Sequence, residues 1–172
     1  YDEFFQTNEV AAASNQLRAA WTRLDALASG QTPWLTQTGP IALGYVSRID
    51  GSVQPYGLVV PASYAPNTPH RFRLDFWFHG RGEKLSELAF VSERSSRPGE
   101  FTPANAFVLH PYGRYCNGSR FAGESDAWEA YDDLRTIYPI DTDRLVVRGF
   151  SLGGAACWHF AVHYASRWAA AA

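Results

Sequence analysis

Ser151 lies at the centre of a short motif that could support nucleophilic chemistry. The sequence LVVRGFSLGG at residues 145–154 has the pattern of a buried strand, then Gly-x-Ser-x-Gly, then the start of a helix. A sharp strand-to-helix turn projects a serine hydroxyl clear of the sheet, and flanking glycines leave the room that such a turn needs. The first helical amides and the positive end of the helix dipole favour negative charge there. We therefore predict that Ser151 is a nucleophile; the alternative is a glycine-rich turn that only packs helix against sheet.

A second motif follows an apolar strand upstream. The residues of FWF, 76–78, run directly into HGRGE at 79–83. A histidine that serves as a general base must reach the hydroxyl it deprotonates. We expect His79 to hold this loop by hydrogen bonds rather than to take part in catalysis.

The elements expected to position these motifs begin with a helix over 7–28, whose apolar residues recur at helical spacing. A linker rich in proline and glycine follows, up to residue 40. The runs 41–49 and 53–60 flank the turn dipeptide Asp50-Gly51, which predicts an antiparallel pair at the edge of a sheet.

Downstream, strands alternate with helices. We predict strands at 71–78, 106–109 and 145–147, and a short helix at 85–92. A further helix is predicted to be capped by Ser125 and stopped by Pro139. From Leu152 a helix that is apolar nearly all round is predicted to be centrally buried, with the final RWAAAA inside it. This alternation favours a mostly parallel sheet with an antiparallel N-terminal edge and helices on both faces.

The order of strand, HG loop, helix, strand, long loop, helix, strand and Gly-x-Ser-x-Gly resembles the N-terminal half of an α/β-hydrolase. More narrowly, YGLVVPASY, FWFHGRGE and YPIDTDRLVVRGFSLGGA resemble the prolyl-oligopeptidase-like and esterase branch of that superfamily. The resemblance implies an α/β-hydrolase fold that is incomplete in this chain. Residues 1–40 would form an N-terminal helix and linker, and residues 41–172 the first part of the hydrolase domain.

The resemblance also implies an oxyanion hole built from two backbone amides. One is the amide after the nucleophile, Leu152, and the other lies in the loop after the third strand. Arg81 is the better match for the second donor, and Gly80 is the alternative. In the same superfamily, an acidic residue and a histidine follow the serine in the chain.

None of the residues after Ser151 is acidic. His159 and His163 lie roughly 10 Å or more along the helix from its start, too far to serve as the base. His110, which precedes the serine, would be an unorthodox base. We therefore expect the base and acid to lie beyond residue 172, in the remainder of a larger hydrolase or on a second chain. The alternative is a short protein that binds ligands and cannot turn them over.

The long loop after residue 109 carries polar residues where α/β proteins place ligands. Its candidates for substrate contact are Tyr112, Arg114, Asn117 and Arg120, and the alternative is an ordered surface loop. We expect Glu124 and Asp126 to stabilise the start of the next helix, and Trp158 and Trp168 to be core residues. Cys116 and Cys157 would form a disulfide in an oxidising compartment, although two cysteines do not establish one.

Composition narrows the function classes. Charged residues make up 19% of the chain and the formal net charge is −2, so no basic surface favours nucleic acid. No apolar run has a membrane-spanning length, and no residue spacing predicts a metal or cofactor site. We expect a serine esterase that acts on a small-molecule or carbohydrate ester, in a secreted or periplasmic location rather than the cytoplasm. The alternatives are a serine peptidase and a non-catalytic binding module.

Overall fold

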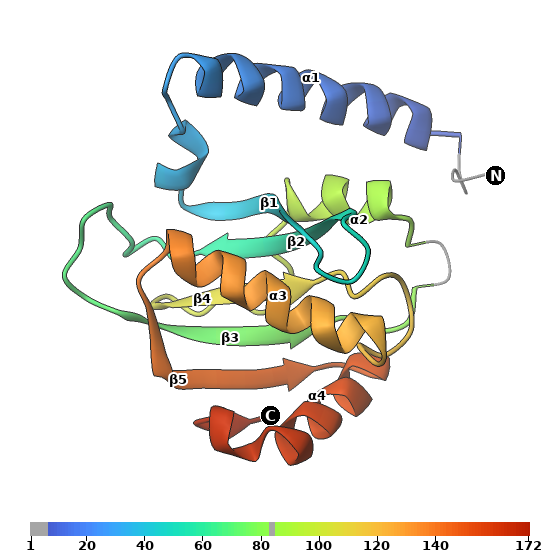
Figure 1. The fold of residues 1–172 in the computed structure, drawn as a ribbon, viewed down its shortest axis with the longest axis vertical. Coiled ribbons are helices and arrows are strands. Elements are labelled where there is room, and N and C mark those ends of the chain that lie inside the picture. Colours follow the sequence, from blue (N-terminus) through green and yellow to red (C-terminus); the bar gives the residue numbers. More distant parts are fainter. Residues whose placement is uncertain (1–6, 83–84) are drawn as a thin grey trace.

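The computed structural model describes residues 7–82 and 85–172. Glu83 of the HGRGE motif and the opening YDEFF therefore lie outside the described residues. The structure alternates strands and helices (Figure 1). In chain order its elements are α1 (Glu9–Ala28), the 3-10 turn η1 (Pro33–Thr36), β1 (Gly39–Val46), β2 (Val53–Val60), β3 (Phe72–Phe78), α2 (Glu87–Arg94), β4 (Ala106–Pro111), α3 (Ala122–Ile137), β5 (Ile140–Gly149), α4 (Leu152–His163), the 3-10 turn η2 (Ala165–Arg167) and β6 (Ala170–Ala171).

The described strands form one mixed sheet in the order β1-β2-β4-β3-β5-β6. β1 pairs with β2 and β2 with β4 in the antiparallel sense, whereas the β4/β3, β3/β5 and β5/β6 pairs are parallel. The turn between β1 and β2 contains Gly51 at a φ of 72°, as the Asp-Gly dipeptide predicts. The predicted antiparallel N-terminal edge and parallel remainder are confirmed.

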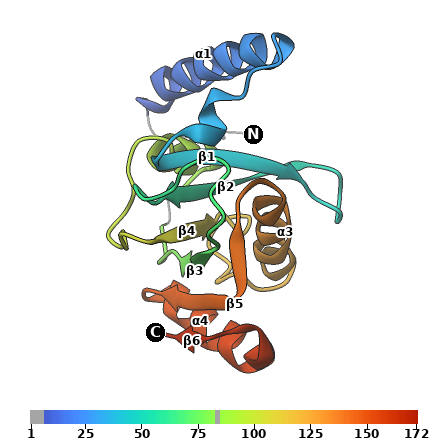
Figure 2. The ribbon, with the colours of Figure 1, turned by 90° about the vertical axis from the view of Figure 1, so that its left-hand side faces the viewer.

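Helices cover both faces of this sheet. Neighbouring residues of β2 point to opposite faces: a β-carbon on Gly57 would be 2.6 Å from the Arg94 side chain of α2, whereas the Tyr56 hydroxyl donates to Asp133 of α3. α3 crosses the front of the sheet in Figure 1 and lies to one side of it in Figure 2. α4 shares the α3 face, because Phe76 packs on Trp128 of α3 and Phe78, two residues on, packs on Phe160 of α4.

Three expectations about the C-terminal part are wrong. α3 begins at Ala122, three residues before Ser125, with Phe121 in the capping position. α4 ends at His163, and the final alanines add a short strand beside β5 rather than a longer helix. Trp158 is 71% exposed and is not a core residue, because one side of α4 is uncovered by the described chain. Trp168 does pack against the core, 5.0 Å from Phe76 between ring centroids.

α1 stands apart from the sheet (Figure 1). Its apolar residues have the predicted helical spacing but do not enter the core, since Leu17, Trp21 and Leu24 are all more than half exposed. Polar contacts hold the helix instead, including Arg23 to the Ala42 carbonyl and Ser86 to Glu9. Among the described residues, no helix has the length and apolar character that a membrane crossing requires.

Candidate active site

Ser151 occupies a strained backbone position between β5 and α4. Its φ is 54° and its ψ is −117°, and its side chain is exposed. A residue with a side chain rarely adopts a positive φ, and such outliers cost about 1–3 kcal/mol and gather at functional sites. The conformation turns the chain sharply out of the sheet into the helix, as expected of a nucleophile on a strand-to-helix turn.

The end of β3 packs directly beneath this turn. A β-carbon on Gly153 would be 1.9 Å from the carbonyl oxygen of Phe78, so only glycine allows α4 to approach β3 this closely. The Phe150 amide donates to the same Phe78 carbonyl at 3.3 Å. The second glycine of the motif is therefore required by packing against the strand that leads into the HG loop.

The first residues of α4 and the HG loop lie close together at this point. Leu152 is the first residue of α4, where a helical amide has no carbonyl partner within its own helix. A β-carbon on Gly80 would be 3.7 Å from the Ser151 β-carbon, which places the HG loop beside the serine. Arg81 follows Gly80 in the same loop and is exposed. The structure thus brings together Ser151, Leu152 and the loop that carries Gly80 and Arg81.

His79 holds that loop, as predicted. Its Nδ1 lies 2.8 Å from the Gly80 carbonyl oxygen and its Nε2 lies 3.1 Å from the Tyr112 carbonyl oxygen. Both partners are carbonyl oxygens and can only accept hydrogen bonds. Because a neutral imidazole has a single N–H, it donates to one of the two carbonyls at a time. The Gly80 carbonyl belongs to the same peptide plane as the Arg81 amide, so the contact also orients that amide.

His110 is buried behind the loop. Burial, with the nearby Arg94 charge, lowers the pKa of His110 to about 3. Its Nδ1 lies 3.4 Å from an Arg94 guanidinium nitrogen, and the residue is only 4% exposed. A buried imidazole with so low a pKa is a poor proton acceptor at neutral pH. The unorthodox role of general base for His110 is therefore not supported.

His159 and His163 lie at a separate cluster between α3 and α4. The Nε2 atom of His159 lies 2.8 Å from Glu124, which also accepts from the Tyr164 hydroxyl, and the two histidine rings are 4.4 Å apart. Burial raises the pKa of Glu124, but the hydrogen bonds from Tyr164 and His159 outweigh this and lower it overall. Glu124 is thus part of an interhelical contact as well as of the first turn of α3. Within residues 7–82 and 85–172, the Ser151 hydroxyl forms no hydrogen bond with a histidine.

Polar side chains of the loop between β4 and α3 form ion pairs and hydrogen bonds with other residues of the protein. Arg114 contacts Asp126 at 2.8 Å and Asp50 at 2.6 Å, and it also donates to Ser47. The Asn117 side chain donates to the Gly113 carbonyl, and Tyr112 is 8% exposed against Phe90. Arg120 is exposed. Substrate contact therefore stays a prediction for this loop.

The two cysteines, whose pairing the sequence leaves open, are free in the structure. Cys157 lies on the buried side of α4, where its Sγ donates to the Val147 carbonyl of β5. Cys116 lies in the long loop and contacts Gly82 of the HG loop instead. Within the part of the chain that the structure describes, no three histidine, cysteine or acidic side chains gather to hold a metal ion.

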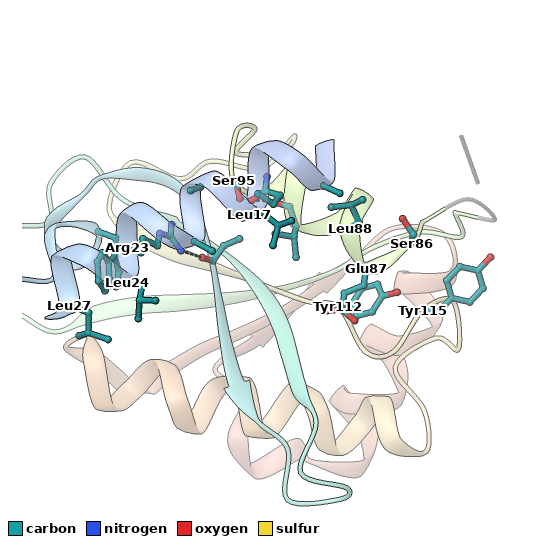
Figure 3. Close-up of a pocket in the computed structure, with 17 residues that line it drawn as sticks. Leu17, Arg23, Leu24, Leu27, Ser86, Glu87, Leu88, Ser95, Tyr112 and Tyr115 are labelled. Carbon is teal, nitrogen blue, oxygen red and sulfur yellow. Dashed lines mark hydrogen bonds between the residues drawn. The ribbon is translucent and has the colours of Figure 1, made fainter. Parts of the chain in front are cut away.

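One hollow lies at the HG loop, and a larger one lies beneath α1. The smaller one, of about 240 Å³, is lined by residues that include His79, Gly80, His110 and Phe150. The larger, of about 1360 Å³, separates α1 from α2 and β1, and its walls are mostly apolar (Figure 3). In Figure 3, Leu17, Leu24 and Leu27 of α1 line one wall, and Tyr112 and Tyr115 mark the end nearest the long loop.

Sequence reasoning missed Phe121, whose conformation repeats that of Ser151. Its φ is 55° and its ψ is −124°, and it too precedes a helix. The side chain is 87% exposed. A strained, exposed aromatic residue is unusual, and no short motif marks it in the sequence. The turn-forming stretch Asn117-Gly118-Ser119 shortly before it is the only available signal.

Comparison with known proteins identifies the fold. No protein-family model and no curated protein sequence matches this chain. Among solved structures, the serine hydrolase FphF of Staphylococcus aureus matches with a TM-score of 0.56 and 19% identity, over 77% of this chain and 56% of its own. The S-formylglutathione hydrolase FrmB of the same organism matches with a TM-score of 0.55 and 17% identity, over 79% and 56%.

A ferulic acid esterase from the anaerobic fungus Anaeromyces mucronatus also matches, with a TM-score of 0.53 and 12% identity, over 77% of this chain and 56% of its own. The chain therefore spans little more than half the length of these structures. These matches and the strand order show that it has the α/β-hydrolase fold.

Proposed function

We propose that the chain supplies the nucleophile and the oxyanion hole of a serine esterase. The observation that carries this proposal is the strained turn at Ser151, which exposes the serine next to the HG loop. Strain of this kind is retained where the surrounding structure and function require it. The neighbours in fold are named as serine hydrolases and esterases, which supports hydrolysis of esters in general.

In the proposed reaction, Ser151 Oγ attacks the ester carbonyl carbon while its proton passes to a base. The amides of Leu152 and Arg81 would donate to the oxyanion of the tetrahedral intermediate. Collapse of the intermediate breaks the bond to the alcohol, which leaves with the proton, and an acyl-serine remains. Water then attacks the acyl group and regenerates the serine, again with the base carrying the proton.

We further propose that a histidine and a carboxylate outside these 172 residues complete the proton transfer. The His79 ring contacts the backbone of the HG loop, and the His110 ring contacts Arg94. The His159 ring contacts Glu124. β6 pairs only with β5 among the described strands, so its other edge is available to a further strand. Trp158 and Val162 on α4, each 71% exposed, also leave apolar surface uncovered. Further chain of the same protein, or a second chain, would cover both.

Substrate comparison tests the reaction class. An esterase should hydrolyse p-nitrophenyl acetate in preference to a prolyl anilide, and an acetylated oligosaccharide would test the finer expectation of a carbohydrate ester. Preference for the anilide would instead support the peptidase alternative. Binding of either compound without turnover by the full-length protein would support a non-catalytic module. The Ser151→Ala variant is the control throughout, because it removes only the hydroxyl oxygen.

A further inference from the structure

Cys116 contacts the backbone of the HG loop at two points. Its Sγ accepts a hydrogen bond from the Gly82 amide at 3.1 Å and lies 3.1 Å from the Gly82 carbonyl oxygen, to which it donates. The two residues are 34 positions apart in the sequence. A thiol is a weak donor and a weak acceptor, so two such contacts to one residue describe a specific fit rather than a strong bond.

The peptide planes in this loop are fixed from two sides. His79 contacts the Gly80 carbonyl, which shares its plane with the Arg81 amide. Cys116 contacts the Gly82 amide, which belongs to the next plane along the chain. The Arg81 amide therefore belongs to the first of two successive peptide planes, of which His79 contacts the first and Cys116, from the long loop, contacts the second. An oxyanion-hole donor must be held in position before the reaction, because reorientation during the reaction would cost the stabilisation it provides.

The loop that presents Cys116 is itself firmly anchored. Arg114 forms ion pairs with Asp126 and Asp50, and the side chain of Asn117 donates to the Gly113 carbonyl. Backbone strain at Arg114 and Tyr115, both at positive φ, is sustained by these contacts. Because this loop is anchored, the contact of the Cys116 thiol with Gly82 restrains the HG loop as well.

We propose that Cys116 is a positioning residue that sets the orientation of the Arg81 amide in the oxyanion hole. The inference rests on the proposed function, since it presupposes that the Arg81 amide stabilises an oxyanion. It assigns Cys116 no direct contact with substrate. Loss of the thiol should lower transition-state stabilisation while leaving ground-state binding nearly unchanged.

The test compares Cys116→Ala, Cys116→Ser and Cys157→Ala in the full-length protein. We measure the rate of Ser151 labelling by a fluorophosphonate, with kcat and KM for p-nitrophenyl acetate. Cys116→Ala should lower the labelling rate and kcat about tenfold, with KM within about twofold, because misplacing one donor costs less than the 100-fold or more of deleting it. Cys116→Ser keeps a donor and acceptor and should recover most of the rate. Cys157→Ala, the matched control away from the loop, should label at the wild-type rate.

Equal labelling rates for wild type and Cys116→Ala would overturn the inference, as would a KM change without a kcat change. Failure of the wild-type protein to label at Ser151 would overturn the proposed function instead, so the two failures are distinguishable. If the Cys116→Ala variant does not fold, the folded wild-type protein is alkylated at Cys116 with iodoacetamide and its labelling rate is measured instead. The bulky adduct should displace Gly82 and slow labelling, and an unchanged rate after complete alkylation would contradict the proposal.

Discussion

Gly149 and Gly153, the two glycines that flank the candidate nucleophile, face each other in direct backbone contact. A β-carbon on Gly149 would be only 2.1 Å from the Gly153 carbonyl oxygen. The chain can therefore reverse from β5 into α4 only if the first of these positions lacks a side chain. Packing thus requires the two glycines of the Gly-x-Ser-x-Gly pattern, and the close approach that they allow accommodates the strained, exposed serine between them.

Replacement of Gly149 with alanine should destabilise the protein strongly, by about 3 kcal/mol or more, because the contact is with backbone that cannot move aside. The matched control is Gly154→Ala. A β-carbon there would be 3.6 Å from its nearest atom, and alanine in a helix is favoured over glycine by up to about 1 kcal/mol. Urea denaturation measures both. Similar stabilities for the two variants would show that the close contact is not required.

The backbone strain at Ser151 predicts that glycine at this position gives a more stable protein than alanine does. Ser151→Gly and Ser151→Ala should both abolish fluorophosphonate labelling, since neither has a nucleophile. Glycine adopts the observed φ of 54° without steric cost, whereas alanine retains the strain. We expect the glycine variant to be about 1 kcal/mol more stable than the alanine variant in urea. A more stable alanine variant would mean that the backbone at position 151 is not strained.

The contacts of Arg114 predict a structural role for this residue. Asp126 is 2% exposed in its side chain, and Arg114 is its ion-pair partner at 2.8 Å. Arg114→Met leaves this buried carboxylate without its ion-pair partner, which typically costs about 3–5 kcal/mol. Adding Asp126→Asn should recover part of the loss in a double-mutant cycle. A variant with normal thermal stability and a raised KM would instead assign Arg114 to substrate binding.

Glu124 should make stability depend on pH. Its pKa is lowered overall in the folded protein, so its contribution is present above its unfolded pKa and is lost as the pH falls through the folded value. The stability difference between wild type and Glu124→Gln should be about 1 kcal/mol above the ordinary glutamate pKa and should shrink as the pH falls through the lowered pKa of the folded state. Urea titrations at several pH values measure this difference. The exposed Glu100→Gln serves as the control, and a constant difference for Glu124→Gln would contradict the assignment.

The sequence predicts the parts of the fold whose signals are local. Alternation of apolar residues located β3, and the Asp50-Gly51 dipeptide located the first turn. The turn at Ser151 could be located because close packing requires glycine at positions 149 and 153.

Features that depend on distant chain could not be predicted in this way. The exposure of Trp158 depends on what lies outside α4, and the contact of Cys116 with Gly82 joins two loops that lie far apart in the sequence. α3 begins directly after Phe121, whose backbone conformation turns the chain into the helix. The capping preference of serine pointed to Ser125 instead, because it does not report backbone conformation. The apolar spacing of α1 predicts a helix, but it does not show whether the apolar face is buried.

The most direct test of the central claim is the mass of the full-length protein after reaction with a fluorophosphonate, with the modified residue mapped by peptide sequencing. We predict a single adduct on Ser151, formed by the wild-type protein and absent from Ser151→Ala. An unmodified wild-type protein, or an adduct that persists in Ser151→Ala, would contradict the assignment of Ser151 as the nucleophile.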